Sequence, residues 1–122
     1  MSNEQPRNND ILSEKSFSFS LRIIKLFKYM QNEHKEYILS KQILRSGTAI
    51  GALIREAKYA QSKADFLNKL MIALKEANET QYWLELLYKS NYIDSKMYKS
   101  IEPDINAILK LLVASTKTVK QG

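Results

Sequence analysis

The sequence predicts an all-α protein, an antiparallel up-down-up-down four-helix bundle. Its 122 residues suit a single domain that is long enough to bury a core. Only three glycines and two prolines are present, which favours long helices joined by few loops. Apolar residues also recur at helical spacing in four successive segments, and amphipathic helices joined by short connections pack as a bundle.

The first helix is expected from about Ser13 to Asn32, after a disordered tail over residues 1–12. Its predicted core stripe is Phe17, Leu21, Ile24 and Phe27. Further apolar residues flank this stripe, namely Phe19, Ile23, Leu26 and Met30. "NEHKEY" is the first connection. The second helix runs from about Ser40 to Tyr59, and its core stripe is Ile43, Ile50, Ile54 and Ala57.

The third helix is expected to follow Ser62, where "SKAD" forms a weak capping box with Asp65, and to end near Lys89. One apolar stripe is predicted to face the core, namely Phe66, Leu70, Ala73, Ala77, Leu84 and Tyr88. A second stripe, Ile72, Trp83 and Leu86, points elsewhere. Because a monomer would leave this stripe in water, we expect it to form an oligomer interface.

Asp94 is the predicted cap of the fourth helix, which fades near Thr116. Its core stripe is Met97, Ile101, Ile105, Ile108 and Leu112. Pro103 points away from this stripe, so a bend or local break is expected there. The bundle domain is therefore predicted over 13–117, with a C-terminal tail over 118–122.

Gly47 and Gly51 stand inside the second helix, where each glycine costs about 1 kcal/mol relative to alanine. Small residues allow helices to approach closely, so both glycines are expected to pack against neighbours and to share the oligomer interface with Ile72, Trp83 and Leu86. The alternative is that both are merely tolerated.

Positive charge gathers in the first third of the chain. The net charge is +6, and residues 15–45 carry seven basic and two acidic side chains. Beside Tyr29, a basic stripe suited to nucleic-acid phosphates is predicted, formed by Lys15, Arg22, Lys25 and Lys28 and continued by Lys41 and Arg45. The alternative is a solvated helix face that serves solubility.

No catalytic constellation is evident. There is no cysteine, and the one histidine, His34, lies in a connection with no Glu-x-x-His motif anywhere. Glu56, Glu76 and Glu79 could hold a hard cation, although such glutamates more often pair with arginine or lysine. We therefore expect no enzyme activity, no cofactor and no metal. A polar start and the lack of an apolar run of about 20 residues favour a soluble cytoplasmic protein.

"LRSGTAIGALIREA" followed by "SKADFLNKLMIALKEANETQYWLELL" resembles the signature of the bacterial four-helix bundle protein family first met as reading frames in intervening sequences of 23S ribosomal RNA genes. The resemblance spans about residues 15–115. It implies an antiparallel four-helix bundle assembled as a homopentameric ring, and it implies no catalytic residue. Two positions depart from the family pattern, Ala49 and Leu53, where serine and asparagine are usual, so a site built on that polar pair is not carried over.

Relatives in this family include accessory proteins of diversity-generating retroelements, which resemble basic rings that bind nucleic acid and a reverse transcriptase. The sequence therefore favours a non-enzymatic homo-oligomer that binds RNA or DNA weakly and without sequence preference. The alternative is an oligomeric scaffold for another protein, such as a reverse transcriptase, without contact to nucleic acid.

Overall fold

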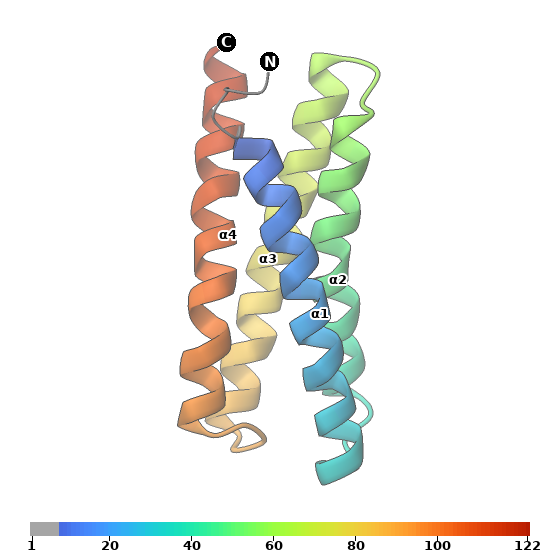
Figure 1. The fold of residues 1–122 in the computed structure, drawn as a ribbon, viewed down its shortest axis with the longest axis vertical. Helices are drawn as coiled ribbons and strands as arrows, with labels where there is room; N and C mark the ends of the chain where they lie inside the picture. The colour runs from blue at the N-terminus through green and yellow to red at the C-terminus, as the bar shows by residue number, and fades with distance from the viewer. Residues whose placement is uncertain (1–7) are drawn as a thin grey trace.

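The computed structural model describes residues 8–122, which form four α-helices and, within that range, no strand (Figure 1). They are α1 (Asn8–His34), α2 (Leu39–Lys58), α3 (Lys63–Lys89) and α4 (Ser95–Gln121). Followed by colour in Figure 1, the chain runs down α1, up α2, down α3 and up α4. α1 packs on α2 and α4, and so does α3, whereas the backbones of α1 and α3 do not come close to each other within the described residues. The predicted all-α four-helix fold is confirmed, and α1 and α3 form a diagonal of the bundle.

The helical region extends further at both ends than the sequence suggested. Residues 1–7 of the expected tail lie outside the described residues. Residues 8–12 belong to α1, and Leu12 is fully buried in the core. At the other end α4 continues to Gln121, past the expected fade near Thr116, and Thr116 is itself buried. The helices therefore extend beyond the boundaries predicted at residues 12/13 and 117/118.

The predicted helix caps are present. The Ser62 side chain accepts a hydrogen bond from the backbone N–H of Asp65 at 3.0 Å, and the Asp65 carboxylate accepts one from the backbone of Gln61. Asp94 accepts from the backbone N–H of Met97 at 2.8 Å, which begins α4 as expected. α4 is a single helix through Pro103, so the predicted break is not present.

Three of the four predicted core stripes are largely correct, and that of α1 is wrong. On α1 the fully or nearly fully buried apolar side chains are Leu12, Phe19, Ile23, Leu26 and Met30, which include all four expected flanking residues. Phe17, Leu21 and Ile24, expected in the core, are 57%, 51% and 36% exposed. More than one face of α1 is apolar, so periodicity alone could not select the buried one.

The glycines of α2 explain which face of α1 is buried. A Cβ at Gly47 would lie 3.0 Å from both Cγ atoms of Ile23, and a Cβ at Gly51 would lie 3.4 Å from the Ser16 carbonyl oxygen and the Ser20 hydroxyl. The two helices therefore approach closely, as expected for these glycines. The neighbour is α1 of the same chain, and Gly47 is already buried there, so its burial does not require an oligomer.

None of the four helices in residues 8–122 combines the length and apolar character needed to cross a bilayer.

Candidate nucleic-acid interface

Two of the six predicted basic residues are held in ion pairs within the chain. Arg22 donates from Nη1 to the Ser100 carbonyl oxygen at 2.8 Å and to Asp104 Oδ2 at 2.7 Å, and from Nη2 to the Ser100 hydroxyl at 2.6 Å. These contacts join α1 to α4 across 82 residues of sequence. Arg22 therefore serves first to hold the two helices together.

Arg45 is the second such residue. It donates to Glu76 at 3.2 Å and to Glu79, and the Trp83 indole N–H donates to the same Glu79 carboxylate at 3.0 Å. The hydrogen bonds from Trp83 and then Arg45 lower the pKa of Glu79, and the bond to Glu79 raises the pKa of Arg45. Since these contacts turn Arg45 toward α3, it does not extend the basic stripe of α1.

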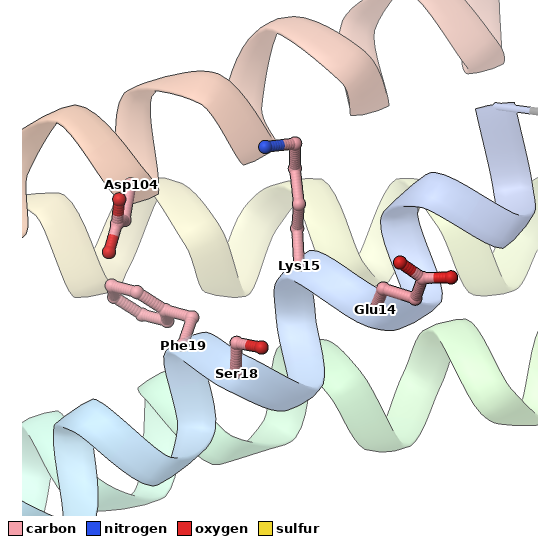
Figure 2. A pocket seen from close by; sticks show the side chains of 5 residues that line it. All are labelled: Glu14, Lys15, Ser18, Phe19 and Asp104. Atoms are coloured by element: carbon pink, nitrogen blue, oxygen red, sulfur yellow. The ribbon is translucent and has the colours of Figure 1, made fainter.

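The other four residues, Lys15, Lys25, Lys28 and Lys41, are exposed, and none has an ion-pair partner within residues 8–122. Lys41 lies in the first turn of α2, whereas the other three lie on α1. Figure 2 shows Lys15 reaching from α1 toward α4, while Glu14 beside it points in another direction. These two residues line a hollow of about 250 Å³ between α1 and α4 together with Phe19 and Asp104.

A second hollow lies further along the same α1–α4 seam. It has a volume of about 270 Å³, and its lining includes Lys25 and Tyr29 of α1 and Met97 of α4. The Tyr29 ring meets the edge of His34 at a centroid distance of 5.5 Å, and His34 meets Tyr92 at 5.4 Å. The seam thus leads from exposed lysines to a cluster of three aromatic rings at one end of the bundle.

The aromatic cluster was missed by the sequence reasoning, which considered His34 only as a metal ligand or a partner of a nucleophile. The predicted topology could have revealed this cluster, because an up-down-up-down order places the end of the first helix beside the connection that follows the third. His34 and Tyr92 stand at those two places. We define the seam surface as Lys15, Lys25, Tyr29, His34 and Tyr92; the predicted Lys28 lines neither hollow of the seam.

The three glutamates considered as cation ligands are not gathered. Glu56 of α2 pairs with Lys69 at 3.3 Å, whereas Glu76 and Glu79 of α3 pair with Arg45, which lies about three turns before Glu56 on α2. No group of three or more histidine, aspartate or glutamate side chains in residues 8–122 is arranged to hold a metal ion.

The predicted interface residues Ile72, Trp83 and Leu86 are half-buried in the single chain, and Trp83 packs partly against the core. They are less exposed than a free apolar stripe would be. The large exposed apolar side chains of α1 and α3 are instead Phe17, Leu21, Ile24, Met71 and Tyr82. Leu53, one of the two departures from the family pattern, also packs against the core.

The fold and this surface define a small all-helical bundle protein with a basic and aromatic seam. The family model of the 23S rRNA-intervening sequence protein matches residues 8–114, so the chain belongs to that family and the resemblance seen in the sequence is confirmed. The matched region begins at the observed start of α1 rather than at residue 13.

A solved structure gives the same answer for the fold. The crystal structure of a protein of unknown function from the S23 ribosomal protein family of Bacteroides thetaiotaomicron is 56% identical to this chain, with a TM-score of 0.89. The match covers 91% of this chain and 99% of that one. No curated protein matches the sequence.

Proposed function

We propose that the protein is a non-enzymatic binder of RNA or DNA, without sequence preference and with single strands favoured over duplex. The observation that carries this proposal is the seam surface, where the exposed Lys25 shares a hollow with Tyr29, the first of three neighbouring aromatic rings. Lysine side chains neutralise phosphates, and aromatic rings stack on bases exposed in a single strand. A duplex hides its bases from such rings.

The homopentameric ring implied by the family resemblance belongs to the same proposal. Repeating the seam surface in several subunits would let one strand contact several copies, which increases avidity without any new contact. Weak binding by one subunit would then become measurable.

The test is fluorescence anisotropy with a labelled oligonucleotide at low and rising salt. Lys15→Glu with Lys25→Glu should weaken binding and flatten the salt dependence, since each neutralised phosphate of a single strand contributes about −0.7 to the slope of log affinity against log salt. Arg22 is left unchanged because its loss would also release α4 from α1.

Lys117→Glu with Lys120→Glu is the matched control, since both lysines are exposed and stand near the far end of α4 from Tyr92. It makes the same change of charge and should leave most of the binding.

Tyr92→Leu should weaken single-strand binding about fivefold or more with an unchanged salt slope, because a stacked base is worth about 1–3 kcal/mol. Wild-type protein that binds no oligonucleotide at low salt would refute the proposal, and equal losses in the two lysine variants would refute the site.

The alternative is a scaffold that binds another protein, such as a reverse transcriptase. The exposed apolar side chains of α1 favour it. Docking through apolar contact would survive added salt, whereas phosphate binding would not.

A further inference from the structure

The two hollows of the α1–α4 seam differ in charge. The one of about 270 Å³, called the Tyr29 hollow below, has Arg22 and Lys25 in its lining and no acid among the described residues. The other is lined by the acids Glu14 and Asp104 as well as by a lysine (Figure 2). An anionic ligand is therefore expected in the Tyr29 hollow and not in its neighbour.

The more deeply placed residues of the Tyr29 hollow are apolar. Leu26 of α1 and Ile101 of α4 are 3% and 6% exposed, and Met97 is half-buried and packs against the core. Tyr29 is the aromatic residue of the lining and is half-buried too. The volume is slightly smaller than the about 300–1,000 Å³ of pockets for drug-sized ligands, so the hollow suits one flat ring system.

Contacts between the helices hold the walls of the Tyr29 hollow in place. Arg22 joins α1 to α4 through the Ser100 carbonyl oxygen at 2.8 Å and through Asp104 at 2.7 Å, directly beside the hollow. The Tyr29 ring makes a T-shaped contact with His34 at a centroid distance of 5.5 Å. A hollow that is formed before a ligand enters loses less conformational freedom on binding.

Lys25 is the cation that remains available to a ligand. It is exposed and has no ion-pair partner in residues 8–122, whereas Arg22 is paired with Asp104 and uses three of its five N–H groups in hydrogen bonds. Lys25 and Tyr29 stand four residues apart on α1, so their side chains are neighbours on one helix face. The ligand that suits this pair has a flat ring with an anionic group close to it, as a nucleotide has.

We propose that the Tyr29 hollow holds one nucleobase, stacked on Tyr29 and packed against Met97, with the phosphate of the same nucleotide at Lys25. This inference rests on the proposed function and names the unit of the strand that the seam binds. Stacking tolerates any sequence, and a purine has the larger ring surface, so adenine should bind more tightly than uracil.

The test follows the methyl signal of Met97 by NMR in the full-length chain with methyl-labelled methionine. Of the four methionine signals, the one lost in Met97→Leu is that of Met97. Adenosine monophosphate should shift this signal in a saturable way, because the base places its ring current beside the methyl group. Ribose phosphate, which lacks the base, should not shift it. The signal of Met71, exposed on α3, should stay in place with both probes.

Two variants separate the base from the phosphate. Tyr29→Leu removes the stacking surface and should weaken adenosine monophosphate and adenosine alike, about fivefold or more. Lys25→Ala should weaken adenosine monophosphate about threefold, as expected for one exposed ion pair, and should leave adenosine unchanged. Because Lys25 is exposed, this second result does not depend on the packing around Tyr29.

Lys110→Ala is the matched control for Lys25→Ala. Lys110 is also exposed and without an ion-pair partner in the described part of the chain, and it stands on the opposite side of α4 from Ile101. The affinities for adenosine monophosphate and adenosine should both remain those of the wild type.

A single-stranded oligoadenylate should shift the Met97 signal in the same direction as adenosine monophosphate. A strand that binds in fluorescence anisotropy without shifting this signal would overturn the inference and leave the proposed function standing. Equal shifts with ribose phosphate, or wild-type affinity in Tyr29→Leu, would overturn it too. Conversely, adenosine monophosphate that shifts Met97 in a protein that binds no strand would support the hollow as a nucleotide site and refute only the proposed function.

Discussion

The two seams of α2 are built in opposite ways. Toward α3 the seam is polar and matched: the Ser46 and Thr80 hydroxyls, both fully buried, lie 2.8 Å apart, and Arg45 pairs with acids at the surface. Toward α1 the seam is steric, which means that it is formed by close packing: Ile23 lies against Gly47, where there is no side chain. No ion pair joins the two helices in residues 8–122.

This difference bears on which surface of the bundle can bind another molecule. In the α2–α3 seam, polar groups of the two helices are paired with each other and are not available to a further partner. Close approach at Gly47 and Gly51 instead draws the two backbones together at the crossing and leaves a groove beside it, with Phe17 and Tyr59 exposed at its edges. The close packing at the glycines and the apolar groove beside it are thus two aspects of one helix crossing.

The largest effect is expected where the steric seam is tightest. Gly47→Leu should lower the free energy of unfolding by about 3 kcal/mol or more, because a Cβ alone would already press on two carbons of the buried, stiff side chain of Ile23. Denaturant unfolding at a fixed protein concentration measures it.

Gly51→Ala is the companion variant. Its Cβ would meet Ser16 and Ser20 only at ordinary contact distance, so the gain in helix propensity should raise stability by about 0.5–1 kcal/mol. Equal losses at both glycines would contradict a seam that is tightest at Ile23.

A smaller effect is expected in the polar seam. Thr80→Val should cost about 1–3 kcal/mol because it removes the partner of the buried Ser46 hydroxyl. Combining it with Ser46→Ala should recover part of the loss, since no buried hydroxyl is then left without its cross-helix partner. A double variant that loses the full sum of the two single costs would show that the two hydroxyls act independently.

The sequence predicted the helices well because each of α2, α3 and α4 has a buried apolar stripe that its spacing reveals. It failed for α1 because apolar residues cover two of its faces, and the choice between them depends on α2. Ile23 fits Gly47, and the small Ser16 and Ser20 face Gly51. Which face of α1 is buried therefore depends on the residues of both helices, and the periodicity of α1 alone does not reveal it.

The candidate site was predicted less completely for the same kind of reason. The sequence located the basic residues of α1, but the partner of Arg22 is Asp104, which stands 82 residues away, and the neighbour of His34 is Tyr92. Which lysines lack partners, and which rings meet, depends on contacts between helices. Whether the seam surface binds nucleic acid stays a prediction.

The smallest effect concerns the charged start of α2, at the end of the steric seam. The Glu36 carboxylate accepts hydrogen bonds from the backbone N–H groups of Ile38, Leu39 and Ser40 at 3.1, 3.0 and 2.8 Å. Partial burial raises the pKa of Glu36, but these hydrogen bonds outweigh it and hold the pKa below the ordinary value of 4.5. This cap was not predicted from the sequence.

Because its folded-state pKa is depressed, Glu36 contributes stability that is present above the pKa of the unfolded chain and is lost as the pH falls through the folded pKa. Glu36→Gln should therefore cost about 1 kcal/mol at neutral pH, as the loss of a helix N-cap does, and the gap to wild type should close on acidification below the ordinary value of 4.5. Glu79→Gln, in the polar seam, should follow the same direction with a smaller cost of about 0.5 kcal/mol, since its partner Arg45 is 52% exposed and screened by solvent. Urea unfolding from pH 7 downward compares the two. A Glu79→Gln cost larger than that of Glu36→Gln would contradict the expectation that solvent screening makes the Arg45–Glu79 pair the weaker of the two.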